Sequence, residues 1–176
     1  MELPAPSIKS VEVLMTKSLT LYHRKKYKEA KQIFTQALTT ARTIKPLPHL
    51  LIARAVGNLA NTSKELQEYA RAVELYEEAL QIFSELQDKK REGIILFNAA
   101  LTYKILRKWK DVVRLMEKRL TLGDELTKDV VKKAQDLIVE GTTAIEKRRK
   151  DDEFIRLLNE LRRATLLVQS RQNNEA

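Results

Sequence analysis

A twelve-residue segment with alternating large and small side chains is the feature that most constrains the fold of this chain. Residues 69–80 read YARAVELYEEAL, and Tyr69, Ala72, Tyr76 and Ala79 stand at offsets of zero, three, seven and ten. Residues at these offsets lie on one face of an α-helix. Leucine alone would satisfy an apolar stripe, so the alternation predicts a face shaped to fit neighbouring helices.

The same pattern occurs twice more, 42 residues earlier and 40 residues later. Residues 27–38 read YKEAKQIFTQAL, and residues 109–120 read WKDVVRLMEKRL, with Arg119 in place of the second alanine. The preceding segments also align, because residues 56–62 (VGNLANT) match residues 96–102 (LFNAALT). Each unit is therefore predicted to be two helices, A and B, of which helix B carries the aromatic–alanine face.

The composition favours helices throughout. The chain has four glycines and four prolines in 176 residues, and no proline after Pro48, so little interrupts a helix. It has no cysteine, which excludes disulfides, thiol catalysis and cysteine-ligated zinc. The 43% hydrophobic content is enough for a core, and no apolar run is long enough to span a membrane.

These motifs resemble the tetratricopeptide repeat, a helix–turn–helix unit with a small residue in helix A, an aromatic residue opening helix B and two alanines in helix B. The 40–42-residue spacing is similar to the long-repeat class found in kinesin light chains and spindle-orientation adaptors. The resemblance implies an all-α, right-handed helical-hairpin solenoid of about eight helices. The positions that match are Ser18, Ala60, Ala100, Tyr27, Tyr69, Trp109, Ala30, Ala72, Ala37 and Ala79.

The expected organisation is an array of three repeats followed by a degenerate C-terminal segment. The predicted segments are a disordered leader (1–8), an array (9–122) of three repeats (11–46, 49–88 and 89–122), a degenerate fourth repeat or capping helix pair (123–171), and a disordered tail (172–176). A solenoid needs such a cap because its terminal unit has no neighbour to cover its apolar face.

The last segment is expected to be two helices, over residues 126–148 and 151–171. Asp151 and Asp152 fit the start of a helix, where carboxylates accept hydrogen bonds from free amides. Phe154, Leu157, Leu161 and Ala164 repeat the large–small spacing once more, and Gly141 is expected to bend or split the preceding helix. The final helix either caps the array or fills its groove.

Nothing in the sequence points to catalysis, a metal or a cofactor. His23 and His49 fall in different repeats without a surrounding motif, and no glycine-rich phosphate loop or zinc-ligand spacing occurs. Glu74, Glu77 and Glu78 are interpreted as a solvated helix face. A non-enzymatic protein that needs no cofactor is the prediction.

The resemblance implies that the A helices line a concave groove that binds a peptide or a helix. Asn58 and Asn98 occupy equivalent A-helix positions, where related long-repeat adaptors use asparagine to hold a peptide backbone amide. The alternative is that both asparagines brace neighbouring helices. The candidate groove residues are Asn58, Asn98, Asn61, Arg54, Lys64, Lys104, Met15, Leu19, Ile94, Phe97 and Leu101.

The clamp with which some tetratricopeptide co-chaperones hold a chaperone's C-terminal carboxylate is not expected here. The resemblance places its five slots at Met15, Leu19, Asn58, Ile94 and Asn98, and only Asn58 matches. Capturing a carboxylate requires cations, which these slots lack. An apolar groove instead favours an amphipathic helix or a hydrophobic peptide.

The net charge of +9 leaves a second class of partner open. Basic residues concentrate in RKKYK at 24–28 and KRRK at 147–150; the second is flanked by Glu146 and Asp151 and is interpreted as an ordinary basic helix end. The predicted function is a protein–protein interaction adaptor for a peptide or amphipathic helix, whose acidic side chains would meet Arg54, Lys64 and Lys104, with nucleic-acid binding or self-association as alternatives. The predicted location is the cytoplasm, with the nucleus as the alternative.

Overall fold

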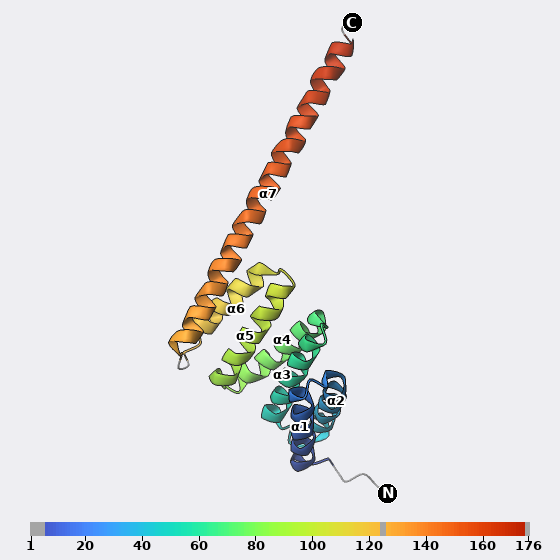
Figure 1. The fold of residues 1–176 in the computed structure, drawn as a ribbon, viewed down its shortest axis with the longest axis vertical. Coiled ribbons are helices and arrows are strands. Elements are labelled where there is room, and N and C mark those ends of the chain that lie inside the picture. The colour runs from blue at the N-terminus through green and yellow to red at the C-terminus, as the bar shows by residue number, and fades with distance from the viewer. Residues whose placement is uncertain (1–5, 124–125, 175–176) are drawn as a thin grey trace.

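The computed structural model describes the backbone of residues 6–123 and 126–174, and the side chains of residues 6–123 and 126–163. This part of the chain forms seven helices and no strands (Figure 1). The helices are α1 (Ile8–His23), α2 (Tyr27–Thr43), α3 (His49–Glu65), α4 (Tyr69–Glu85), α5 (Lys89–Ile105), α6 (Trp109–Thr121) and α7 (Lys128–Asn174). The all-α helical-hairpin solenoid is confirmed, with close to the expected eight helices.

Each helix packs against the helix before it and the helix after it. Helices α1, α3 and α5 are the A helices of three hairpins, and α2, α4 and α6 are the B helices. Figure 1 shows the hairpins stacked one after another from the blue N-terminal end to the yellow α6. Contacts also join α3 directly to α5, so successive A helices share one side of the stack.

The large–small face of the B helices forms the centre of the core. Ala30, Ala37, Ala72 and Ala79 are all completely buried, as is the large Tyr76 between the last two. A methyl side chain allows two helix backbones to approach closely, and an aromatic ring fills the space beside the contact. The alternation therefore follows from packing between helices, as the sequence predicted.

The turns inside the three hairpins have the same backbone conformation. Lys25, Gln67 and Arg107 stand one residue after the C-cap of an A helix, with φ values of 60°, 62° and 55°. These positions are 42 and 40 residues apart, which is the spacing of the repeats. A left-handed residue at this place ends one helix and redirects the chain into the next, so the repeats share their turn as well as their helices.

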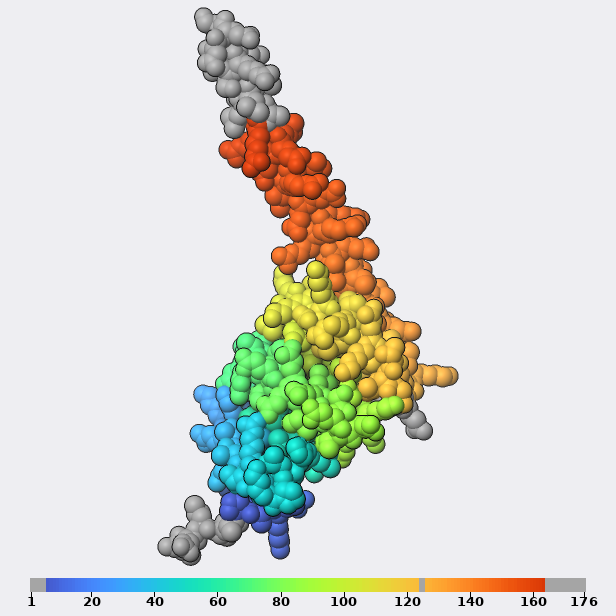
Figure 2. Space-filling model, turned by 180° about the vertical axis from the view of Figure 1, so that it is seen from behind, coloured from blue at the N-terminus to red at the C-terminus, as the bar shows by residue number. Residues whose placement is uncertain are grey.

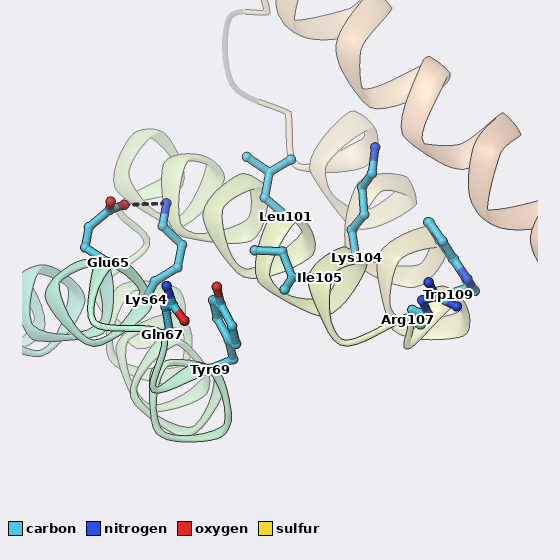
Figure 3. Close-up of a pocket in the computed structure, with 9 residues that line it drawn as sticks. All are labelled: Lys64, Glu65, Gln67, Tyr69, Leu101, Lys104, Ile105, Arg107 and Trp109. Carbon is cyan, nitrogen blue, oxygen red and sulfur yellow. Dashed lines mark ion pairs between the residues drawn. The ribbon is translucent and has the colours of Figure 1, made fainter.

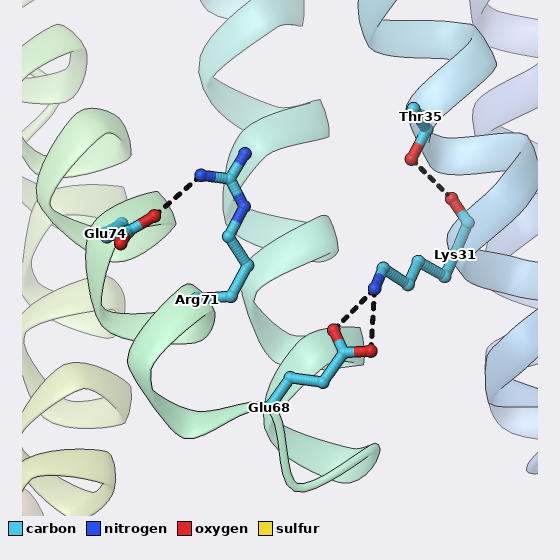
Figure 4. Close-up of polar contacts among 5 residues, drawn as sticks. All are labelled: Lys31, Thr35, Glu68, Arg71 and Glu74. Carbon is cyan, nitrogen blue, oxygen red and sulfur yellow. Dashed lines mark hydrogen bonds and ion pairs between the residues drawn. The ribbon is translucent and has the colours of Figure 1, made fainter.

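A salt bridge on the B-helix side links the first repeat to the second. The Lys31 Nζ of α2 lies 2.7 and 2.5 Å from the two carboxylate oxygens of Glu68, the residue that precedes α4 (Figure 4). The same view shows Arg71 pairing with Glu74 one turn along α4, at 2.7 Å. Both pairs are partly exposed, so they fix local geometry more than they add stability.

The third repeat replaces an alanine contact with an arginine. Arg119 of α6 is only 7% exposed and occupies the slot of Ala37 and Ala79. Its guanidinium packs over Gly93 of α5, where an added Cβ would lie 2.7 Å from Arg119 Cζ. The glycine provides the room that a longer side chain needs, so this departure from the repeat pattern is accommodated locally.

The chain after α6 forms one helix, and the expectation of separate helices over 126–148 and 151–171 is wrong. Helix α7 runs through Asp151 and Asp152, which lie within it and do not begin a new helix. Gly141 does not split α7 either; it is buried where α7 crosses the start of α6, and a Cβ there would lie 2.8 Å from Val113 Cγ2. Its small size allows close approach, and the absence of proline lets the helix continue.

Only the first part of α7 covers the array. Ala134 and Leu137 are buried against α6, whereas the later turns extend beyond the hairpins as a single rod (Figures 1 and 2). For the predicted leader, residues 1–5 lie outside the described part, and Ser7 caps α1 through a capping box. For the predicted tail, residues 175–176 lie outside it, and α7 includes Asn174.

Candidate peptide-binding groove

A cleft of about 270 Å³ lies on the A-helix side of the stack. Helices α1, α3 and α5 provide most of its walls, with one side chain from the last turn of α4. We call it the groove cleft; its lining residues are Leu19, Ala53, Arg54, Gly57, Asn58, Asn61, Phe83, Arg91, Ile94 and Ile95. Five of the predicted groove residues therefore meet in one place.

The floor of the groove cleft is apolar, and its two uncharged polar side chains, Asn58 and Asn61, come from one helix, α3. Ala53 and Ile95 are buried, and Gly57 lies between them without a side chain. An added Cβ at Gly57 would lie 2.9 Å from Ile95 Cδ1, so α3 and α5 approach closely here. Asn58 stands half-exposed above this floor, and its side-chain amide has no hydrogen bond to any described residue. That amide is available to a ligand.

The other two asparagines are joined in a hydrogen-bond network. The Asn61 Oδ1 accepts from the hydroxyl of Tyr76 at 2.6 Å and from Nδ2 of Asn98 at 3.1 Å. Burial raises the pKa of Tyr76 above its ordinary value, against an opposing effect from the hydroxyl of Thr102, so the phenol stays protonated and donates. Asn61 and Asn98 therefore brace three helices, α3, α4 and α5.

A second and larger cleft of about 660 Å³ lies at the turn end of the second and third repeats. We call it the turn cleft; its lining residues are Lys64, Glu65, Gln67, Tyr69, Leu101, Lys104, Ile105, Arg107 and Trp109 (Figure 3). Lys64 pairs with Glu65 at 3.4 Å, and the Lys104 Nζ lies 2.6 Å from the Glu140 carboxylate of α7. Both lysines are thus partly neutralised within the chain.

The predicted groove set therefore separates into three groups. Leu19, Arg54, Asn58, Asn61 and Ile94 line the groove cleft. Three others, Lys64, Leu101 and Lys104, line the turn cleft.

The last three residues of the set line neither cleft. Phe97 packs against the core, and Asn98 is held by Asn61. Met15 is only 2% exposed, so its assignment to the groove surface is wrong. It shares the buried face of α1 with Val11 and Ser18, four residues before it and three after it.

Five groove-cleft residues were not found from the sequence: the floor residues Ala53, Gly57 and Ile95, and the wall residues Phe83 and Arg91. Phe83 comes from the end of α4, a B helix, and reaches the cleft because α4 turns directly into α5. Arg91 lies in the first turn of α5 and pairs with the carboxylate of the N-cap residue Asp88. Burial alone would raise the pKa of Asp88, but hydrogen bonds from the Arg91 backbone and side chain outweigh it and lower the pKa. The Asp-x-x-Arg spacing at the helix start was the available signal.

The described residues form clefts in which a ligand can bind. They contain no group of three or more histidines, aspartates or glutamates close enough to hold a metal ion. None of the described helices is long and apolar enough to cross a membrane. A free amide above an apolar floor can hydrogen-bond to a peptide backbone while apolar side chains of the ligand fill the cleft.

The stacked hairpins and their grooved A-helix side define the chain as a helical-repeat solenoid. Two sequence profiles described as tetratricopeptide repeat match residues 51–124 and 11–43. The chain belongs to the tetratricopeptide repeat family. It is 32% identical over 78 residues to the tetratricopeptide repeat protein 19 homolog, mitochondrial, of Drosophila melanogaster. This match covers 44% of the chain and only 21% of the length of that relative.

Solved structures of similar shape support the same fold. The BtubC (BKLC) crystal structure from P. vanneervenii has a TM-score of 0.62 at 18% identity, covering 80% of this chain and 62% of that one. The TPR2AB-domain:pHSP90 complex of yeast Sti1 gives 0.64 at 18% identity, covering 81% and 51%. The N-terminal domain of STI-1 from C. elegans gives 0.60 at 16% identity, covering 73% and 94%.

Proposed function

We propose that this protein is a non-enzymatic interaction adaptor whose groove cleft binds a peptide or an amphipathic helix of a partner protein. The observation that carries the proposal is the Asn58 amide, which has no partner among the described side chains and stands above an apolar floor. A primary amide both donates and accepts, so it matches the peptide group of a bound chain irrespective of sequence. The apolar floor supplies the burial that such a contact needs.

The groove cleft has little unpaired positive charge, which favours a mainly apolar ligand with few acidic side chains. Arg54 is exposed at the rim, whereas Arg91 is already paired with Asp88. The solved yeast Sti1 structure is a complex with pHSP90, but the clamp slots predicted here carry no cation. We therefore expect side-chain packing in the cleft, with the backbone held by Asn58, and no capture of a terminal carboxylate.

The test compares Asn58→Ala with Asn159→Ala, a matched change on the exposed surface of α7. Proteins captured by the wild type are identified, and the affinity of each purified partner is then measured for both variants. Asn58→Ala is expected to weaken binding about tenfold, the effect of losing one or two hydrogen bonds. Asn159→Ala should leave binding unchanged, and both variants should melt like the wild type. Full binding by Asn58→Ala would refute the assignment.

Helix α7 favours self-association as a second candidate function. Phe154, Ile155, Leu157 and Leu158 are each between 48% and 62% exposed on the part of α7 that extends beyond α6. Contiguous exposed apolar side chains often mark an interface. Sedimentation of the wild type and of Leu158→Asp tests this: a dimer that the aspartate converts to a monomer supports it, and a monomeric wild type at high concentration removes it.

A further inference from the structure

A third cleft, of about 580 Å³, lies between the start of α6 and the middle of α7, on a different part of the molecule from the groove cleft. The lining residues of this basic cleft are Arg107, Lys108, Trp109, Lys110, Asp111, Ala144, Ile145, Arg148, Arg149 and Asp152. The first five belong to the turn and first turn of α6, and the others to α7. Because KRRK at 147–150 lies inside α7, its interpretation as a helix end is wrong.

The basic cleft carries an excess of positive charge that the described residues do not neutralise. It has five cations and two carboxylates, and one carboxylate, Asp111, is paired with Arg114 at 3.1 Å. Arg107, Lys110, Arg148 and Arg149 form no ion pair with any residue that the structure describes. Cations held together without counter-charges attract an acidic ligand.

The two walls of the basic cleft are held in place by packing. Trp109 Cε3 would lie 3.9 Å from a Cβ added at Gly141, so the indole lies directly against α7. Ala144 and Ile145 follow one turn later and extend the apolar surface beside the ring. The cleft therefore combines an apolar floor with two arginines of one helix and basic side chains of another. The packing fixes the two helices, so a ligand has only the exposed basic side chains left to order.

We propose that the basic cleft binds a short acidic segment of a partner protein. Carboxylates of this segment pair with Arg148, Arg149 and Lys110, since the planar guanidinium matches a carboxylate in bidentate geometry. An apolar side chain between the carboxylates packs on Trp109. A nucleic-acid strand fits less well, because Asp111 and Asp152 also line the cleft and the cations form one compact group, not an extended track.

The experiment uses the full chain and Trp109, which is its only tryptophan. The probe is a fluorescein-labelled octapeptide of alternating glutamate and leucine, and its control replaces each glutamate with glutamine. An eight-nucleotide oligothymidylate is the third ligand. Binding is measured by fluorescence anisotropy at low and moderate salt. The emission of Trp109 in the presence of each unlabelled ligand reports a ligand beside the indole; because Trp109 also lines the turn cleft, the Arg148 and Arg149 variants assign that ligand to the basic cleft.

The variants compare equal charge changes on one helix. Arg148→Gln with Arg149→Gln removes two cleft cations, whereas Arg162→Gln with Arg163→Gln removes two exposed arginines of α7 outside the cleft. The first pair is expected to weaken binding of the acidic peptide at least about tenfold, and the second less than about twofold. Lys110→Gln, on the opposite wall, should weaken it as well. All three variants change exposed side chains and should melt like the wild type.

Three results would overturn the proposal. The first is an acidic peptide that leaves the Trp109 emission unchanged or binds no better than its glutamine control. The second is an equal loss of binding in the two arginine pairs, which indicates a diffuse charge effect. The third is tighter binding of the oligothymidylate than of the peptide, which assigns the cleft to nucleic acid. Asn58→Ala should leave binding of the acidic peptide to the basic cleft unchanged. Failure of the basic-cleft proposal is therefore distinguishable from failure of the groove-cleft proposal.

Discussion

The hydrogen bond from Tyr76 to Asn61 provides the sharpest test of how the groove is built. Tyr76 is completely buried, and its hydroxyl lies 2.6 Å from Asn61 Oδ1. Tyr76→Phe removes only the donor and leaves Asn61 with its bond from Asn98. The expected cost is about 1 kcal/mol of unfolding free energy. For a chain of this length that lowers the melting temperature by about 2–4 °C.

Asn61→Ala is expected to cost more, because it removes the acceptor and leaves a buried hydroxyl behind. An unsatisfied buried group costs about 1–3 kcal/mol, and here the lower half of that range is expected. The reason is Thr102, whose hydroxyl lies close enough to Tyr76 to influence its pKa and can take the place of Asn61 as acceptor. Thr102 already donates to the Asn98 carbonyl oxygen at 2.9 Å, so its own proton is engaged.

The double variant Asn61→Ala with Tyr76→Phe decides between a specific bond and independent packing effects. Asn98 loses its acceptor in both Asn61 variants, but the double variant has no orphaned Tyr76 hydroxyl, so its cost should fall below the sum of the single costs by about 1 kcal/mol. Urea unfolding of all four proteins, checked with two spectroscopic probes for a single transition, gives the free energies. A coupling energy below about 0.3 kcal/mol would refute the hydrogen-bond reasoning.

Three further predictions concern the helix ends and the contacts between repeats. Asp88→Ala should cost about 1 kcal/mol at neutral pH. Because the pKa of Asp88 is lowered in the folded protein, this contribution is complete above the ordinary aspartate pKa of about 4 and disappears as the pH falls below it, which urea unfolding at several pH values measures. Gly141→Leu should destabilise the α6–α7 packing by about 1–3 kcal/mol in thermal melts, whereas Thr142→Leu, at the exposed neighbouring position, should have little effect. Replacing both Lys31 and Glu68 by alanine should cost less than about 1 kcal/mol, and added salt should reduce the difference from the wild type.

The repeats could be predicted from the sequence because one physical requirement appears in the first two repeats, and the third keeps their spacing. Close approach of two helices demands small residues at fixed intervals, and Ala72 and Ala79 meet that demand in the second repeat as Ala30 and Ala37 do in the first. The turns were less visible. The left-handed position carries lysine, glutamine or arginine, so no glycine marks it, and only the repeat spacing reveals that Lys25, Gln67 and Arg107 are equivalent.

The candidate groove could be predicted only in part. The helical spacing of a residue indicates which face of the helix it occupies, but not which side chains it contacts there. Asn58 and Asn98 occupy equivalent positions in the sequence, yet the structure gives them different surroundings. Asn98 meets Asn61 of the preceding repeat, and Asn61 also meets Tyr76, which the sequence placed on the face that packs against neighbouring helices. Asn58 has no such neighbour among the described residues. The neighbouring repeat therefore determines which of the two asparagines keeps a side-chain amide that a ligand can bind.

Helix α7 shows why the two ends of this array behave differently. It packs on α6 where a fourth A helix would follow, and Ala134, Leu137 and Gly141 cover that end of the core. A complete repeat would then turn back and place a B helix against its A helix. Here α7 continues straight, so its later apolar residues, such as Phe154, extend past the hairpins without a B helix from the described chain to cover them. The same continuation carries Arg148 past the start of α6 and creates the basic cleft. Capping the array and building that cleft are therefore consequences of one uninterrupted helix.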